Sequence, residues 1–481
     1  MKTVKYIEYI FLSIIIAASL ISRLYKINNP IADWHSWRQA DTASVTRTFV
    51  SGGINLLYPK YHDISSIQTG IFNPKGYRFV EFPIYNAIHA LLAKTRFPFT
   101  LEVWGRLVSV FSSLVTIFFV YLIGKKLLGV NGGLLTAFFF GLLPYNIYFS
   151  RVILPEPLAL AFGVFAIWAF MKFVEAKNYL FLYISSLSFA LGALTKPFVL
   201  FYMIPAAYLA VKTFGFKGIL NSRKLLFNLL AAFDLAVIPF FLWRIWMNQF
   251  PQGIPFFTWA FNGDGIRFRP AFWKWIFVER IGHLILGSWG IVLLFFGFFK
   301  GKQKELFSLV FFLAMFLYIS VFATANVRHD YYQAAIIPAV SLILARGFIY
   351  VWELARKNTL SIFVFLFALA MMFLGGLSMV KEFYNINHPE IILAGQEVDK
   401  LAPKDALVVA PYNGDTAFLY QTGRWGWPYV DRPIEELVKF GADYFVSVNL
   451  NDFQTGEIME KYQVIRKSET FVIVDLNQRN R

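Results

Sequence analysis

Long apolar stretches separated by short polar loops are the dominant pattern along this chain. A helix that spans a membrane needs about 20 mostly apolar residues, and many stretches approach or reach that length. The pattern predicts about eleven spans, at residues 5–24, 104–124, 132–149, 157–174, 178–195, 197–213, 225–246, 282–299, 305–325, 331–350 and 359–380. We therefore expect a polytopic α-helical membrane protein.

The first long interruption of this pattern, residues 25–103, is too long to be a simple connection. Within it, the stretch 34–50 mixes aromatic and aliphatic residues with polar ones, which is typical of an interfacial helix. A second apolar stretch, Tyr85–Leu92, is too short to span and is expected to be interfacial or re-entrant. The loop is therefore predicted to be structured.

A second large loop, 247–281, is rich in Trp, Phe and basic residues, as is usual at a membrane interface. The tail beyond the last span alternates short β-branched runs with helical patterns. The predicted strands lie at 406–410, 444–448 and 471–474, and the predicted helices at 392–401 and 434–440. We expect a transmembrane domain, 1–380, that includes both large loops, and a small α/β domain, 381–481.

Composition supports the membrane prediction. Of the residues, 57% are hydrophobic and only 15% are charged, which is too few charges for a water-exposed surface. The net charge of +16 suggests a nucleic-acid partner or an anionic membrane surface. The basic residues decide between them, because they fall in alternate loops, at Lys2 and Lys5, Lys125–Lys126, Lys172–Lys177, Lys212–Lys224, Lys300–Lys304 and Arg356–Lys357. We expect contact with membrane lipids and no nucleic-acid partner.

This alternation also predicts an orientation in the cytoplasmic (plasma) membrane. If the N-terminus is cytoplasmic, residues 25–103, 150–156, 247–281 and 326–330 lie outside, together with the tail after about residue 381. The first span has no small-residue cleavage site and is expected to remain as an anchor. The chain contains no cysteine, which excludes disulfides, thiolate metal sites and a cysteine nucleophile.

Polar and ionisable residues cluster at the predicted outer ends of the spans. The first cluster, residues 33–41, reads DWHSWRQAD. On one helix Asp33 and Asp41 would lie about two turns apart and roughly on one face. Either carboxylate could accept a proton from an incoming hydroxyl or amine. A purely structural alternative makes Asp33 a helix N-cap and pairs Asp41 with Arg38.

The second cluster contains Arg151 and Glu156 at the start of a span, and Lys196 lies between two other spans. Glu156 is a second candidate acid. The structural alternatives are an Arg151–Glu156 ion pair at a helix end and a Lys196 side chain that extends to the interface.

The third cluster, residues 326–333, reads NVRHDYYQ and again lies between two apolar spans. Arg328, His329, Tyr331 and Tyr332 offer hydrogen-bond donors suited to the phosphate of a lipid carrier. The alternative is an ordinary interfacial belt of aromatic residues with neutralised charges.

Asp234 is different, because it lies near the middle of a predicted span, where an acid is costly. It could belong to an ion pathway or bond a neighbouring helix. The sequence shows no Gly-rich phosphate loop, His-x-x-x-His pair or Gly-x-Ser-x-Gly elbow at a credible place. A nucleotide-dependent soluble mechanism is therefore unsupported.

The order of these motifs carries a family resemblance. An acidic first loop is followed by Arg106-Leu, Arg151-x4-Glu156-Pro, Leu-Thr-Lys196-Pro and His329-x-Tyr-Tyr. Over roughly residues 5–350 the chain resembles the GT-C glycosyltransferases of the protein O-mannosyltransferase and lipid A aminoarabinose transferase superfamily. Its DWHSWRQADTA segment resembles the first-loop signature of a bacterial branch.

The resemblance implies transfer of a sugar from a polyprenyl-phosphate donor (undecaprenyl or dolichyl type) to an acceptor on the outer face, with inversion. It assigns the base to a first-loop acid, here Asp33 first and Asp41 second, and makes Glu156 the second-loop acid. The family's usual Asp-Glu pair is absent, and Arg38-Gln39 stand where it would fall. The expected substrate-binding residues are His35, Arg38, Arg151, Lys196, Arg328, His329, Tyr331 and Tyr332.

No obligatory metal is expected, and the donor is a lipid-linked sugar. The acceptor is a protein, a lipid or a glycan. In the tail, segments 411–417 and 424–428 are candidates for acceptor recognition or for a structural cap. Two other functions stay open: a transporter or flippase of a lipid-linked glycan, in which Asp234 belongs to the pathway, and an inactive scaffold that has lost the Asp-Glu pair.

Overall fold

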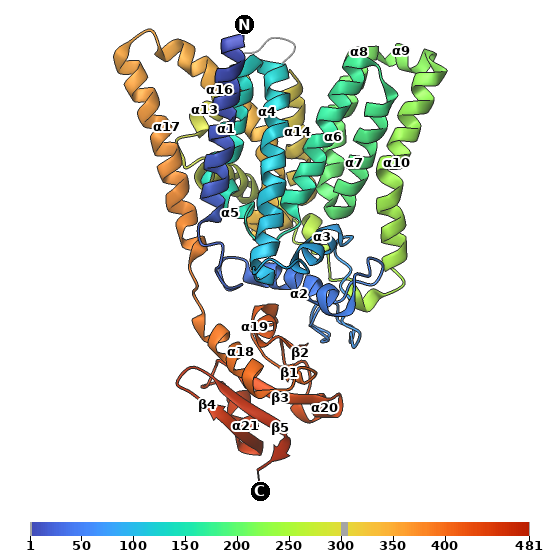
Figure 1. The fold of residues 1–481 in the computed structure, drawn as a ribbon, viewed down its shortest axis with the longest axis vertical. Coiled ribbons are helices and arrows are strands. Elements are labelled where there is room, and N and C mark those ends of the chain that lie inside the picture. The colour runs from blue at the N-terminus through green and yellow to red at the C-terminus, as the bar shows by residue number, and fades with distance from the viewer. Residues whose placement is uncertain (1, 300–305, 481) are drawn as a thin grey trace. The chain divides into compact units, whose positions relative to one another are not determined.

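The computed structural model describes residues 2–299 and 306–480, with side chains from residue 6 onward (Figure 1). The predicted basic positions at Lys300–Lys304, and the side chains of Lys2 and Lys5, lie outside this description. The chain forms two compact units that are discontinuous in sequence. The membrane unit contains Met1–Ile27, Arg106–Trp243 and Phe257–Glu382, and the second unit contains Asn28–Gly105, Arg244–Phe256 and Phe383–Arg481.

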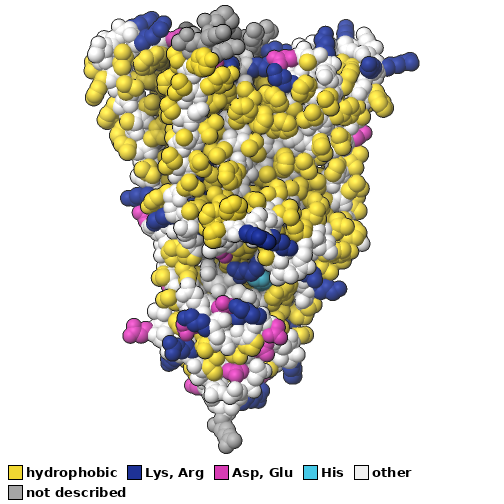
Figure 2. Space-filling model, viewed as in Figure 1, with side chains coloured by type: hydrophobic (Ala, Val, Ile, Leu, Met, Phe, Trp, Pro, Cys, Tyr) yellow, Lys and Arg dark blue, Asp and Glu magenta, His cyan; other side chains and the backbone are white. Residues whose placement is uncertain are grey.

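Apolar helices make up the membrane unit. Within the described residues, seven helices are long and apolar enough to cross a membrane. The main helices are α1 (Lys2–Leu24), α4 (Leu101–Leu142), α6 (Glu156–Ala176), α7 (Tyr179–Thr195), α8 (Met203–Phe214), α10 (Arg223–Met247), α14 (Leu306–Val321), α16 (Ile337–Ala355) and α17 (Thr359–Val380). Hydrophobic side chains make up much of the face of this unit that is drawn in Figure 2. The protein is therefore an integral membrane protein with several apolar helices, although fewer of the described helices reach spanning length than the about eleven spans predicted.

The two predicted spans 104–124 and 132–149 correspond to the two parts of α4, although the second part ends earlier, at Leu142. The backbone between them is not helical at Gly129, where φ is 79° and ψ is −177°. The two parts lie against each other, because a Cβ added at Gly133 would lie 2.8 Å from the Tyr121 carbonyl oxygen. Only glycine adopts this conformation without strain. A separate short helix, α5 (Pro144–Phe149), follows, because Pro144 cannot donate to the preceding turn.

The predicted span 282–299 is also divided. A π-helical segment, Trp275–Ile285, is followed by a turn and then by α13 (Ile291–Phe299). Helix α13 packs closely on α16: a Cβ added at Gly347 would lie 1.9 Å from the Leu293 carbonyl oxygen. Small residues at such crossings are typical of membrane helices, because attraction there depends on close packing.

A mixed five-stranded sheet forms the core of the tail, in the second unit. Its strands are β1 (Leu407–Val409), β2 (Trp425–Trp427), β3 (Ala442–Ser447), β4 (Tyr462–Lys467) and β5 (Val472–Arg479), in the order β2-β1-β3-β5-β4. The first three in this order are parallel, and β5 is antiparallel to both β3 and β4. The covering helices are α18 (Pro389–Leu401), α19 (Thr416–Thr422), α20 (Ile434–Lys439) and α21 (Phe453–Lys461).

The predicted small α/β fold is confirmed, with β1, β3 and β5 at the expected runs. Strands β2 and β4 were not predicted. Strand β2 is only three residues long and contains Gly426, and five of the six residues in β4 are exposed, so neither has a buried β-branched run.

The first large loop contributes α2 (Ser36–Gly52) and α3 (Ile84–Ala93) to this same unit, both close to their predicted positions. Val45 and Phe49 of α2 pack with Tyr61 and with Ala90 of α3. The polar stretch at the start of α2 is also buried, including Arg38, Gln39 and Asp41. Because buried polar groups need partners, this stretch must be held by hydrogen bonds from neighbouring segments.

Those neighbours include the tail. Gln421 of α19 donates to the Ile31 carbonyl oxygen over 2.9 Å, and the Arg47 guanidinium of α2 lies 3.7 Å from the centre of the Tyr420 ring. The Tyr420 hydroxyl in turn donates to Glu102 Oε1 over 2.5 Å. Residues from the first loop and from the tail therefore share one folded core.

Candidate active site

Asp33 lies in the turn that leads into α2 and is only 4% exposed. The Gln39 amide donates to Asp33 Oδ1 over 2.6 Å and also to the Trp34 carbonyl oxygen over 3.2 Å. Trp34 stacks on Phe383 with ring centroids 5.0 Å apart, which fixes this turn within the second unit. A neutral amide thus orients the Asp33 carboxylate.

Asp41 has a different environment. It is 1% exposed, its Oδ2 forms an ion pair with Arg78, and its Oδ1 accepts a hydrogen bond of 2.7 Å from the Thr416 hydroxyl. Both carboxylate oxygens are engaged by side chains of other segments. Asp41 therefore anchors α2 to the loop residue Arg78 and to α19.

The two structural alternatives for this motif are wrong. The N-cap of α2 is His35, in a left-handed conformation with φ 58°, and not Asp33. Arg38 pairs with Glu81, and Asp41 pairs with Arg78. Glu81 and Arg78 were not identified from the sequence, because their partners lie about 40 residues away along the chain, beyond the spacing of helical pairs.

Further buried acids lie near Asp41. Burial raises the pKa of Asp63 to about 6, and the charge of Asp41 adds to the shift, although Ser65 and the Tyr61 hydroxyl donate to the carboxylate. Burial and the Asp41 charge likewise raise the pKa of Asp415, the N-cap of α19, to about 6. Asp63 and Asp415 therefore both lie within range of the Asp41 charge.

In the membrane unit, Lys196 Nζ lies 2.8 Å from Glu156 Oε1. Glu156 is the first residue of α6, where the helix dipole favours a negative charge, and Lys196 connects α7 to the 3₁₀ turn Pro197–Tyr202. The alternative in which the Lys196 side chain extends to the membrane interface is wrong. This side chain is only 12% exposed and forms an ion pair with Glu156. Arg151, which is fully buried, donates to the Lys26 carbonyl oxygen over 2.6 Å.

The residues of the third cluster lie together in the membrane unit with part of loop 247–281. The His329 ring stacks against Tyr331 with centroids 5.6 Å apart and meets Trp259 edge-on at 5.6 Å. Tyr332 lies 6.2 Å from the same ring. The Arg328 guanidinium lies 5.7 Å from the centre of the Trp259 ring, and its side chain is 57% exposed. We call these five residues the cationic socket.

Two acids, Asp264 and Asp330, lie beside residues of the cationic socket and pair with arginines. Asp264 lies 3.8 Å from Arg328, and a hydrogen bond from the Thr324 hydroxyl, followed by the Arg328 charge, lowers its pKa. Asp330 is buried, and its carboxylate lies 3.5 Å from Arg280. Tyr145 donates to its carbonyl oxygen over 2.5 Å. These partners come from distant segments, so sequence spacing could not identify them.

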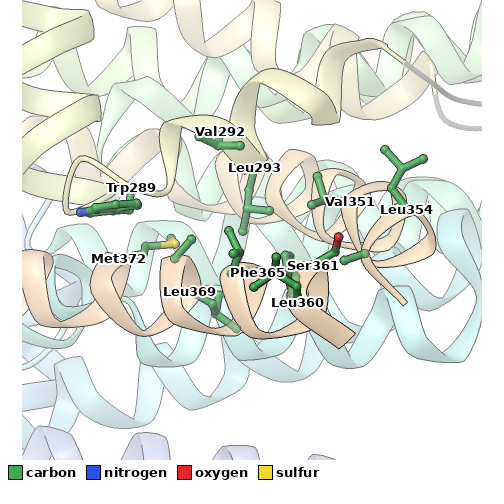
Figure 3. Close-up of a pocket in the computed structure, with 13 residues that line it drawn as sticks. Trp289, Val292, Leu293, Val351, Leu354, Leu360, Ser361, Phe365, Leu369 and Met372 are labelled. Carbon is green, nitrogen blue, oxygen red and sulfur yellow. The ribbon is translucent and has the colours of Figure 1, made fainter. Parts of the chain in front are cut away.

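Apolar hollows in the membrane unit lie elsewhere. One of about 430 Å³ lies between α13, α16 and α17, with Trp289, Leu293, Phe365 and Met372 in its wall (Figure 3). Another, of about 650 Å³, lies between α6, α7, α8 and α10. Neither is lined by a predicted site residue, so neither holds the polar chemistry.

The second unit has a polar hollow of about 500 Å³, lined by Arg47, Gln396, Asp399, Lys400, Lys404, Gln421 and Gly423. It lies beside α19, whose residues Thr416 and Ala417 end the predicted segment 411–417. Segment 424–428 has a structural role in the same unit: Arg424 is buried and donates to Asp399 Oδ1 over 2.6 Å, and Trp427 belongs to the sheet core.

Among the described residues, no three His, Asp or Glu side chains are placed to hold a metal ion together. Among the predicted site residues, the side chains that can carry a positive charge are those of His35, Arg38, Arg151, Lys196, Arg328 and His329.

Comparisons with known proteins support a glycosyltransferase fold. Residues 85–243 match the model of the family described as dolichyl-phosphate-mannose-protein mannosyltransferase. ArnT from Cupriavidus metallidurans bound to undecaprenyl phosphate has a TM-score of 0.64 at 14% identity, over 96% of this chain and 97% of ArnT. No curated protein sequence matches the chain.

Two other solved structures are similar. The Archaeoglobus fulgidus oligosaccharyltransferase gives a TM-score of 0.55 at 13% identity, over 92% of this chain and 68% of that one. The mycobacterial arabinofuranosyltransferase AftD gives 0.53 at 14% identity, over 96% and 41%. The predicted resemblance is thereby confirmed: residues 85–243 match the mannosyltransferase family, and the chain has the fold of the GT-C membrane glycosyltransferases.

Proposed function

We propose that this protein is an inverting glycosyltransferase that moves a sugar from a polyprenyl-phosphate donor to an acceptor at the outer face of the cytoplasmic membrane. The observation that carries the proposal is the cationic socket, in which exposed Arg328 lies with His329 beside Trp259. A guanidinium and an imidazole suit phosphate oxygens, and Tyr331 and Tyr332 add hydroxyl donors. ArnT, which has the same fold, binds undecaprenyl phosphate.

The base in this proposal is Asp33. Asp33 Oδ1 accepts a hydrogen bond from the Gln39 amide. Asp41 has one carboxylate oxygen paired with Arg78 and the other bonded to the Thr416 hydroxyl, so it joins three segments of the second unit. We therefore assign proton abstraction to Asp33 and a positioning role to Asp41.

The reaction begins when Asp33 accepts the proton of an acceptor hydroxyl or amine. The acceptor's electron pair then forms the new bond to the anomeric carbon, from the face opposite the phosphate. The bond from that carbon to the phosphate oxygen breaks, and its electron pair leaves on the polyprenyl phosphate. Arg328 and His329 stabilise this developing charge.

The remaining predicted residues have supporting roles. Glu156 and Lys196 form an ion pair that places an acid and a base together at the start of α6. Arg38 and Arg151, held by Glu81 and by the Lys26 carbonyl oxygen, fix the segments that carry the acids. His35 holds the left-handed turn before α2.

The proposed orientation follows from the basic loops. Lys and Arg side chains gather at the end of the membrane unit that contains the N-terminus (Figure 2). The positive-inside rule places such an end in the cytoplasm. By the alternation of the spans along the sequence, the loops that carry the residues of the cationic socket then lie outside.

The test uses purified protein in liposomes and a panel of polyprenyl-phosphate sugars with radiolabelled sugar, comparing wild type with Asp33→Asn, Asp41→Asn and Arg328→Ala. We expect one donor to release its sugar. Asp33→Asn should lower turnover by roughly 10² to 10⁴ fold, as loss of a general base does. Arg328→Ala should lower it by roughly 10² fold or more, while Arg269→Ala, at an exposed position in loop 247–281, should not.

Binding of a donor without turnover of any donor in the panel would contradict the proposal. Equal losses in Asp33→Asn and Arg269→Ala would contradict the assigned roles.

A further inference from the structure

Helix α10 carries an acid on the face that points away from the rest of the membrane unit. Asp234 lies near the middle of Arg223–Met247, and its side chain is exposed. Leu230 and Ile238, one turn to either side, are 55% and 48% exposed. No residue in the described part of the chain forms a hydrogen bond or ion pair with Asp234.

The opposite face of α10 faces the rest of the unit. Ala232 and Ala236 are buried, and with Phe233 and Val237 they help to line the apolar hollow between α10 and helices α6 to α8. Figure 1 shows α10 at the edge of the membrane unit. Asp234 therefore contributes neither to this hollow nor to the cationic socket, and the ion-pathway interpretation has no polar lining to support it.

An acid at this depth needs a partner. Position 234 is eleven residues from the first residue of the helix, and thus roughly 16 Å along its axis, near the centre of a hydrocarbon core of about 30 Å. Carboxylates are strongly disfavoured there, and those that occur usually pair with a cation or a hydrogen-bond donor. The exposed residues on either side of Asp234 are aliphatic or aromatic, as on a surface that contacts another helix or lipid.

We propose that the outward face of α10 binds a transmembrane helix of another protein, and that this helix carries a lysine or arginine at mid-membrane depth. Charge complementarity selects the partner, because a cation is what the solitary carboxylate lacks. A second copy of this chain fits less well: a two-fold contact on this face would place Asp234 against Asp234. Leu230 and Ile238 would supply the apolar packing around the pair.

The test measures binding of synthetic helices to the reconstituted full-length protein. The probe is a fluorescent peptide of about 20 leucine and alanine residues, long enough to span, with one central lysine. Its control has leucine in place of the lysine. By energy transfer in liposomes, we expect wild type to bind the lysine peptide about tenfold more tightly than the leucine peptide, as polar pairs in membranes allow.

Two variants locate the effect. Asp234→Leu should remove the preference for lysine. Leu230→Asp in the Asp234→Leu background moves the acid by one turn, about 6 Å along the helix. This double variant should prefer a peptide whose lysine is shifted by about four residues in the matching direction.

Three results would overturn the proposal. The first is equal binding of the two peptides to wild type, which would mean that lipid or water alone satisfies Asp234. The second is a lysine preference that persists in Asp234→Leu. The third is self-association of wild type that depends on Asp234, which would assign this face to a second copy.

Discussion

At the scale of single residues, two acids of one motif have distinct surroundings. Asp33 is oriented by an amide, and Asp41 is enclosed by Arg78 and Thr416. The sequence placed both on or near one helix, and the packing of other segments made them different. Substitutions at the two positions should therefore have different effects, mainly on turnover at Asp33 and mainly on stability at Asp41.

Asp41→Asn should destabilise the protein, because it leaves the buried Arg78 without its counter-charge. Removing one partner of a buried ion pair costs about 3–5 kcal/mol. Thermal unfolding in detergent should show a lower midpoint for Asp41→Asn than for wild type. Adding Arg78→Met to Asp41→Asn should recover part of the loss, and a still lower midpoint in the double variant would contradict this account.

The raised pKa of Asp63 predicts a pH dependence of stability. Its pKa in the fold, about 6, exceeds the ordinary value of 3.8, so the folded state binds the proton more tightly than the unfolded state does. Its contribution to stability is therefore most favourable below about pH 4, falls as pH rises to about 6 and stays low above that. The change amounts to roughly 3 kcal/mol at most.

Asp63→Asn removes this titration and can keep an acceptor for the Ser65 amide. The variant should gain stability relative to wild type at pH 7.5 and show little gain at pH 4. The comparison is a pair of denaturation curves at each pH. A gain that is the same at both pH values would show that ionisation of Asp63 is not its cause.

At the scale of elements, close helix packing depends on glycines that the hydrophobic pattern does not reveal. The crossing of α13 and α16 leaves no space for a Cβ at Gly347, which would lie 1.9 Å from the Leu293 carbonyl oxygen. Backbone cannot yield as a flexible side chain can. The helices must therefore separate if this glycine is replaced.

Gly347→Ala should lower stability by roughly 1–3 kcal/mol, as overpacking does. Gly218 of α9 (Phe216–Asn221) is a matched control, because a Cβ there meets nothing within 4 Å. Gly218→Ala should be neutral or slightly stabilising. The check is thermal unfolding of both variants in the same detergent, and equal midpoints would contradict the packing argument.

At the scale of the whole molecule, the first loop and the tail share one compact unit. Removal of residues 385–481 should unfold the first loop as well, because Asp41, Ile31 and Glu102 lose their partners on α19. Limited proteolysis should then cleave within residues 28–105, a region that we expect to resist cleavage in the full chain. A truncated protein with an equally resistant loop would show that the loop folds by itself.

Hydrophobic periodicity alone determined most of the membrane architecture. Spans such as α6, α7, α10 and α17 begin and end near their predicted residues, because each must present about 20 apolar residues to lipid whatever its neighbours are. The break at Gly129 lies in the predicted gap between residues 124 and 132. The break at Pro144 was missed, because a break within a long apolar stretch depends on backbone conformation rather than on hydropathy.

The sequence also showed the candidate site residues: the acids of the first loop, the Glu156 and Lys196 motifs and the cluster at 328–332 were all visible as polar residues next to spans. Only the tertiary structure decided their partners. Arg78, Glu81, Asp264, Arg280 and Thr416 lie far along the chain from the residues they contact. Ion pairs and hydrogen bonds depend on distance in space, and only the folded chain sets that distance.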